Sequence, residues 1–157
     1  MSALCRILLV EETADEWRAA LSSLSESGLM NQTTVVNGHG EALDYLYARG
    51  AFRRRPSGLP AVVVMGPSLQ WSATLALLNH IRGAASLRRV PIVVIAAGAN
   101  PETIQSAYEC GANSVVLRHP DPAIHGQQYA ILGLFWGWAN EPPGGCLPQP
   151  KSERRVA

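Results

Sequence analysis

Two adjacent carboxylates, Glu11 and Glu12, follow directly on the apolar run at residues 5–10. Carboxylate oxygens at the end of a buried strand can hold a hard cation such as Mg²⁺. A second apolar run, residues 61–65, ends at Gly66, and the three residues after it offer only one hydroxyl. Because two carboxylates without a third oxygen from position 66 make a poor Mg²⁺ site, no metal and no other cofactor is predicted.

The elements that must position these residues alternate along the chain. Short apolar runs predict strands, and the longer stretches between them carry apolar residues at helical spacing. The predicted strands are residues 5–10, 32–36, 61–65, 91–97 and 113–117; the predicted helices run from Thr13 to a stop at Gly28 and over residues 41–49, 72–82, 101–110 and 122–140. Five such units predict an α/β fold, a flavodoxin-like (βα)5 doubly wound parallel sheet with strand order 2-1-3-4-5.

The first helix has a start signal of its own. Thr13 and Glu16 form the pattern of a capping box, in which the threonine accepts a backbone hydrogen bond and the glutamate reaches back to the first turn. In the predicted strand order, the carboxyl ends of the first and third strands form the crevice where open α/β sheets bind ligands. Glu11, Glu12 and Gly66 are therefore predicted to meet in that crevice.

Composition limits the classes of partner. The chain has 157 residues, 47% of them hydrophobic, which predicts one domain over residues 1–140. Residues 141–157 contain four prolines and are predicted to be a disordered tail. A net charge of +1 argues against nucleic-acid binding, and the arginines at 53–55 are interpreted as a solvated turn. The apolar start is too short for a signal peptide or a membrane span, so a cytoplasmic protein without a membrane partner is predicted.

Several stretches together resemble a known family. "ILLVEE", "GHGEALDYL", "SLRRVPIVVIAAG" and "YECGANSVVLRHP" resemble, in order, the first strand with its acidic pair, the second helix, the entry into the fourth strand, and the fifth strand of the receiver domain of bacterial response regulators. The resemblance covers residues 5–140. The arginine-bearing loop at residues 51–60, the "LRRVP" segment and the "GLFWGW" ending are most similar to stand-alone receivers that work with bacterial phytochromes.

The resemblance also implies which residues should do chemistry, and most of them are changed. Receivers transfer a phosphoryl group to an aspartate that ends strand 3, with two acids holding Mg²⁺, a hydroxyl after strand 4 and a lysine after strand 5. The acids correspond to Glu11 and Glu12. The other positions fall on Gly66 (or Met65 if the register slips), Ala96, and Arg118 (or His119), and the aromatic switch position falls on Val115. This implies a degenerate, phosphorylation-independent pseudo-receiver that is not an enzyme, in which Arg118 is expected to pair with Glu12.

The last predicted helix is apolar on nearly every side, whereas a surface helix needs only one apolar stripe. One face must pack on the sheet, so the other is predicted to be covered by a second protein, unless the tail folds back over it. The candidate interface residues are Tyr129, Leu132, Phe135, Trp136 and Trp138. The resemblance implies a homodimer through this helix, since receivers dimerise through helix 4, strand 5 and helix 5.

Together these features predict a protein that acts by binding. The resemblance implies a sensor histidine kinase or a bacteriophytochrome as partner, because helix 1 of a receiver docks the phosphotransfer helices of a kinase. An alternative is a receiver-fold module that binds a small ligand or a metal at the crevice of Glu11 and Glu12.

Overall fold

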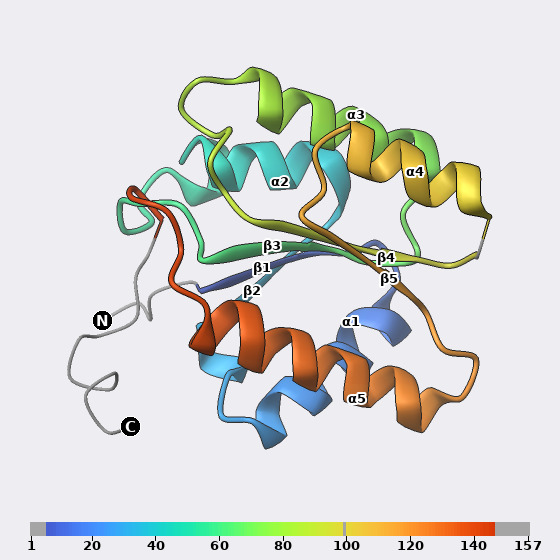
Figure 1. The fold of residues 1–157 in the computed structure, drawn as a ribbon. Coiled ribbons are helices and arrows are strands. Elements are labelled where there is room, and N and C mark those ends of the chain that lie inside the picture. Colours follow the sequence, from blue (N-terminus) through green and yellow to red (C-terminus); the bar gives the residue numbers. More distant parts are fainter. Residues whose placement is uncertain (1–5, 99, 147–157) are drawn as a thin grey trace.

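The computed structural model describes residues 6–98 and 100–146. One sheet of five parallel strands in the order β2-β1-β3-β4-β5 forms its centre, which confirms the predicted fold (Figure 1). The strands are β1 (Ile7–Val10), β2 (Thr33–Val36), β3 (Val62–Met65), β4 (Ile92–Ala96) and β5 (Ser114–Leu117). They are slightly shorter than predicted, since end residues such as Gln32 and Asn113 lie outside the paired register, and residue 5 lies outside the described residues.

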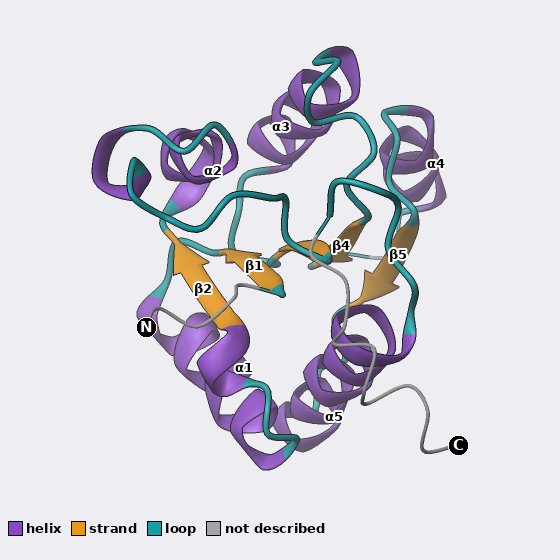
Figure 2. Ribbon diagram, turned by 90° about the vertical axis from the view of Figure 1, so that its left-hand side faces the viewer, coloured by secondary structure: helices purple, strands orange, loops and turns teal. Residues whose placement is uncertain are grey.

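In the described part of the chain, five α-helices cover the sheet. They are α1 (Ala14–Glu26), α2 (Gly38–Leu46), α3 (Trp71–Gly83), α4 (Pro101–Glu109) and α5 (Pro122–Leu132). Figures 1 and 2 show α2, α3 and α4 on one face and α1 and α5 on the other. Leu8 and Val63 belong to the apolar core on the first face, whereas Leu9 and Val64 belong to the second core. Successive strand residues thus point into opposite layers, as the pleat requires.

The second helix begins one turn before its predicted start at residue 41. Gly38 adopts a φ of 77°, a backbone conformation that glycine reaches without a steric penalty. The Glu41 carboxylate accepts a hydrogen bond of 2.6 Å from the backbone N–H of Asn37, the residue that caps the helix. Glu41 therefore lies in the first turns of α2 and stabilises its start.

The last helix changes character after Leu132. A π-helical segment, Gly133–Ala139, continues α5, and the Asn140 N–H bonds the Phe135 carbonyl across the wider turn. The two glycines of this segment lie against α1 and β1: a Cβ on Gly133 would lie 2.4 Å from the Leu24 side chain on α1, and one on Gly137 would lie 2.9 Å from Ile7 on β1. Glycine at both positions lets the segment pack closely on α1 and β1.

Two predictions about the surface need correction. Residues 141–146 are not a disordered tail: the Leu59 N–H donates to the Gly145 carbonyl at 3.0 Å, and Cys146 is buried beside the core. Residues 147–157 lie outside the described residues. The arginine turn is only partly solvated, because Arg55 donates hydrogen bonds to the carbonyls of Tyr45 and Leu46. None of the described helices has both the length and the apolar character needed to span a bilayer.

Candidate functional site

The carboxyl edge of the sheet brings the predicted site residues together. Val10 pairs with Met65, and the Gly66 N–H donates to the Val10 carbonyl at 2.9 Å, so Glu11 and Gly66 leave neighbouring strands side by side. The Arg118 N–H donates to the Ala96 carbonyl at 2.9 Å on the next pair of strands. The predicted crevice therefore exists, with Glu11, Gly66, Ala96 and Arg118 along one edge.

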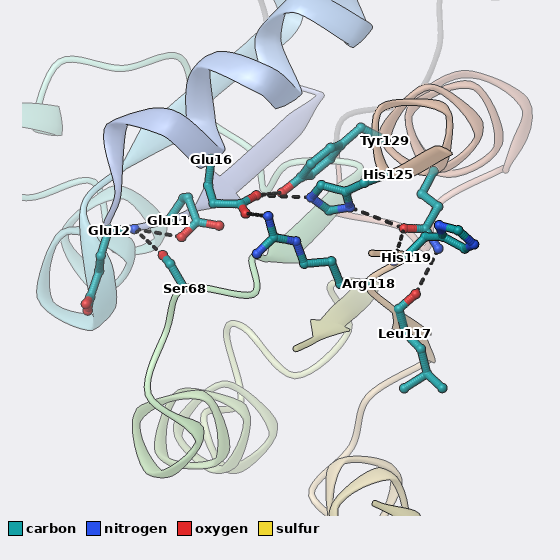
Figure 3. A network of polar contacts seen from close by, with 10 residues as sticks. Glu11, Glu12, Glu16, Ser68, Leu117, Arg118, His119, His125 and Tyr129 are labelled. Carbon is teal, nitrogen blue, oxygen red and sulfur yellow. Dashed lines mark hydrogen bonds and ion pairs between the residues drawn. The ribbon is translucent and has the colours of Figure 1, made fainter. Parts of the chain in front are cut away.

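Glu11 occupies the space that a side chain at position 66 would need. Its side chain is buried, and its Oε1 accepts a hydrogen bond of 2.9 Å from the Glu12 N–H (Figure 3). Its Oε2 is buried without a hydrogen-bond partner among the described residues. A Cβ built on Gly66 would lie 1.8 Å from this Oε2 and 2.6 Å from the carboxyl carbon. Position 66 can therefore carry no side chain while Glu11 keeps this conformation.

Burial also changes the acidity of Glu11. The pKa of its carboxyl is raised from an ordinary 4.5 to about 7: loss of solvation is the main cause, the hydrogen bond from the Glu12 N–H opposes it, and the nearby Glu16 carboxylate adds to it. A buried carboxyl with one unpaired oxygen is costly to ionise, so the crevice holds a carboxyl that changes charge near neutral pH.

Glu12 turns away from this crevice. Its backbone N–H donates to the Ser68 hydroxyl at 3.1 Å, but its exposed side chain points away from Glu11 in Figure 3. The Glu12 carboxylate lies 3.0 Å from where a Cβ on Gly38 would be, which places it beside the N-terminus of α2. The positive end of the helix dipole stabilises a carboxylate there.

The acidic pair is thus divided, and its geometry does not fit Mg²⁺. The ion requires several oxygens around one point, whereas here one carboxylate is buried against Gly66 and the other lies at a helix terminus. No group of three acidic, histidine or cysteine side chains within residues 6–98 and 100–146 is arranged to hold a metal ion. A cavity of about 320 Å³ beside the pair is lined by Glu11, Glu12, Glu41 and Trp17 among others.

Arg118 pairs with Glu16, not with Glu12 as predicted. One Arg118 nitrogen lies 2.5 Å from Glu16 Oε1. The capping box was also wrong: Thr13 does precede α1 as its N-cap, but no side-chain hydrogen bond caps the helix. Both predictions, the Arg118–Glu12 pair and the capping box, failed for the same reason. The Glu16 side chain is buried on the inner face of α1 and points towards β5 and α5 (Figure 3).

Glu16 joins three elements through a network that the sequence did not reveal. Its Oε2 lies 3.0 Å from His125 Nε2 and 3.5 Å from the Tyr129 hydroxyl, both on α5. Burial, followed by the carboxylates of Glu11 and Glu16, raises the pKa of Tyr129 far above its ordinary value, so the phenol stays protonated as a donor. The i, i+4 spacing of His125 and Tyr129 was a usable signal, because it places two polar groups on one face of a helix.

Gln128 completes the network by contacting the second ring nitrogen of His125. Its side-chain nitrogen donates to the Leu117 carbonyl, and its Oε1 accepts from the His119 N–H, so the orientation of the amide is fixed. The same Oε1 lies 3.2 Å from His125 Nδ1. Both ring nitrogens of His125 thus face side-chain oxygens, Nε2 that of Glu16 and Nδ1 that of Gln128.

Removing the charge of Glu16 is expected to destabilise the fold. Glu16→Gln leaves Arg118 and the buried His125 without their shared carboxylate, and a broken ion pair with a buried member costs about 2 kcal/mol or more. Urea unfolding at pH 7 measures this difference. Asp15→Asn is the matched control, because Asp15 is the exposed neighbour on the same helix and its loss is expected to cost less than about 0.5 kcal/mol. Equal stabilities of the two variants would contradict the role of the network.

The predicted interface divides into two faces. Tyr129 and Leu132 are buried in the core, and Trp136 packs partly against it, so these three residues do not form an exposed surface. Phe135 and Trp138 remain 51% and 47% exposed. The same outer surface carries Ile131 and Leu134, and we name Ile131, Leu134, Phe135 and Trp138 the outer α5 patch. The prediction was wrong for the buried residues because a helix apolar all round does not indicate which side meets the sheet.

Comparisons with known proteins identify the family to which this fold belongs. No model of a protein family and no curated protein matches the sequence. Among solved structures, the bacteriophytochrome response regulator RtBRR is 33% identical, with a TM-score of 0.65 over 90% of this chain and 86% of that one. The bacteriophytochrome response regulator AtBRR is 31% identical, with a TM-score of 0.67 over 87% of this chain and 96% of that one. A phosphorylated cyanobacterial phytochrome response regulator, RcpA, shares the fold at 22% identity, with a TM-score of 0.78 over 90% of this chain and all of that one.

The fold and the crevice define a receiver domain of the CheY-like class. The chain belongs to the response-regulator receiver family, and its relatives there include bacteriophytochrome response regulators.

Proposed function

We propose that this protein is a pseudo-receiver, which accepts no phosphoryl group and acts in two-component signalling by binding other proteins. The observation that carries the proposal is the packing of Glu11 against Gly66, where an acceptor aspartate would project its side chain. A glycine offers no nucleophile, and the neighbouring carboxylate is buried with its free oxygen closed to solvent.

The other parts of the phosphorylation chemistry support the same proposal. Ala96 has no hydroxyl, and Arg118 is engaged by Glu16 instead of pointing to an acceptor at position 66. Glu12 lies at the N-terminus of α2, away from Glu11. Without a nucleophile, no side chain at this position accepts the phosphoryl group. Without a divalent cation and a free basic side chain, the negative charge that develops during transfer is not stabilised.

The partner proposed is a sensor histidine kinase, or a bacteriophytochrome that carries one. The support is family membership: the relatives RtBRR and AtBRR are bacteriophytochrome response regulators. A receiver that keeps the kinase-docking face of α1 but lacks the acceptor would occupy the kinase without draining its phosphoryl group. Its effect would be to slow phosphoryl transfer to a competent regulator.

Incubation with a phosphoryl donor tests the first half of this proposal. We expect no phosphoryl adduct after treatment with acetyl phosphate and Mg²⁺, as measured by intact mass, under conditions that phosphorylate a competent receiver. A stoichiometric adduct on the protein would contradict the proposal. For the second half, adding the protein to a phosphorylated kinase and its competent regulator is expected to slow transfer, and an unchanged rate would remove the competitive role.

We also propose that the protein forms a homodimer through the outer α5 patch. Exposed aromatic residues at the centre of an interface often carry most of its binding energy. Phe135→Ser with Trp138→Ser is expected to weaken dimerisation at least about thirtyfold, which corresponds to roughly 2 kcal/mol. Sedimentation equilibrium measures the change, and Met30→Ser is the control, because Met30 is 44% exposed outside the patch. A wild-type monomer at micromolar concentrations, or equal dimerisation of both variants, would contradict this proposal.

A further inference from the structure

A second cavity opens at the carboxyl edge of the sheet, on the face covered by α3 and α4. Its volume is about 330 Å³, within the range of roughly 300 to 1,000 Å³ that holds small ligands. Gly66, Ile95 and Ala96 form its floor at the ends of β3 and β4. Ligands of open α/β sheets bind outside the carboxyl ends of the strands, so the cavity lies where the fold favours binding.

The walls of this cavity carry hydrogen-bonding groups but no charge. Trp71 and Thr74 line it from the first turns of α3, and Asn100 and Thr103 line it from the start of α4. None of the described residues that line it is acidic, basic or a histidine. Thr74 is only 2% exposed, so its hydroxyl is a buried polar group beside an apolar surface. No side chain caps the first turn of α3, since Gln70 makes no capping hydrogen bond.

The absence of charge on this lining restricts the ligand. An ion moved from water into this site loses hydration that no charged side chain of the described lining replaces. An aromatic or branched apolar body gains from contact with Leu69, Trp71 and Ala96, and a single carbonyl or hydroxyl can pair with the threonine hydroxyls. The neighbouring cavity has a different lining, which includes the carboxyl groups of Glu11, Glu12 and Glu41.

We propose that the cavity between α3 and α4 binds an uncharged small molecule with an apolar body and one hydrogen-bonding group. Ala96 leaves room in this cavity, because the position lacks the hydroxyl side chain that a phosphorylation site would place at this edge. The binding site does not require the proposed function: it can exist or fail whether or not the protein accepts a phosphoryl group.

Three benzene derivatives of nearly equal shape test the proposal on the full chain. Benzamide is neutral, benzoate is an anion and benzamidine is a cation at pH 7. Amide chemical shifts in ¹H–¹⁵N spectra report where each one binds. Benzamide is expected to shift the amides of Trp71, Thr74 and Thr103 saturably, with a dissociation constant on the order of 1 mM for a fragment of this size. Benzoate and benzamidine are expected to leave these three amides unshifted.

Two variants place the ligand inside the cavity. Thr103→Phe fills its mouth and is expected to weaken benzamide binding at least about tenfold. Gln105→Phe is the matched control, because Gln105 is exposed on the same helix outside the lining. The affinity of this variant for benzamide is expected to stay within about twofold of the wild-type value. Thr74→Val keeps the shape, removes the hydroxyl, and is expected to weaken binding about fivefold. It provides the test if Thr103→Phe fails to fold.

Three results would overturn the inference. The first is no saturable shift of these amides by benzamide in a folded protein. The second is binding of benzoate or benzamidine at this cavity as tightly as benzamide, which would refute the uncharged class. The third is unchanged benzamide affinity in the folded Thr103→Phe and Thr74→Val variants.

Discussion

Replacing Gly66 with aspartate is expected to leave the protein unable to accept a phosphoryl group and to lower its stability by about 3 kcal/mol. The new Cβ would lie 1.8 Å from Glu11 Oε2, so one of the two side chains must move, and overpacking of this kind costs roughly 1–3 kcal/mol. The new carboxylate would also stand beside a buried carboxyl, and like charges repel strongly where water is excluded. Urea unfolding and acetyl phosphate labelling measure the two effects.

Two further variants isolate the steric cause. Gly98→Asp adds the same side chain at the same edge of the sheet, where a Cβ meets no atom within 4 Å, and is expected to cost less than about 0.5 kcal/mol. Glu11→Asp combined with Gly66→Asp shortens the obstructing acid and is expected to recover part of the stability lost in the single variant. Efficient phosphorylation of Gly66→Asp alone would show that Glu11 moves aside freely, and would refute the blocking role.

The second large effect is a fall in stability as pH rises from about 4.5 to about 7. In this interval the folded protein retains the Glu11 proton, whereas the unfolded chain, with its ordinary pKa of 4.5, has released it. Because the folded state binds more protons, the free energy of unfolding decreases with pH, and the loss is complete above pH 7. A shift from 4.5 to about 7 corresponds to roughly 3 kcal/mol.

Glu11→Gln tests this assignment, because glutamine keeps the size of the side chain and cannot ionise. The variant is expected to match the wild type below pH 4.5 and to exceed its stability by up to about 3 kcal/mol above pH 7. Urea unfolding across this pH range measures both curves, and a ¹³C titration of the Glu11 carboxyl gives its midpoint directly. Glu12→Gln is the control for removing one carboxylate from the adjacent, exposed position. A pH slope that persists in Glu11→Gln would assign the effect to another group.

The sequence predicts the sheet well because burial on both faces leaves a simple record. Each central strand is a continuous apolar run, and strict alternation with helices allows few topologies. Helix ends were less predictable. The start of α2 depends on the hydrogen bond between Glu41 and Asn37 and on the positive φ of Gly38, and neither feature follows from the spacing of apolar residues.

The site was predictable at the level of the backbone but not of the side chains. Strand order places Glu11, Gly66, Ala96 and Arg118 at one edge, whatever their rotamers. It does not determine that Glu12 turns to the N-terminus of α2, or that Arg118 finds Glu16 instead. Such choices depend on distances between elements far apart in the sequence. Tyr129 and Leu132 were predicted to lie in an interface but are buried in the core. The reason is related, since only the packing of α5 on the sheet determines which of its sides faces inwards.

The contact between Glu11 and Gly66 also bears on how this sequence can evolve. While Glu11 is present, any residue larger than glycine at position 66 meets its carboxyl group. While Gly66 is present, a shorter acid at position 11 would leave unfilled space in a buried site, which is destabilising as well. Each single step towards an acceptor site therefore passes through a less stable protein. The two positions depend on each other, so a change towards an acceptor aspartate is difficult to make one substitution at a time.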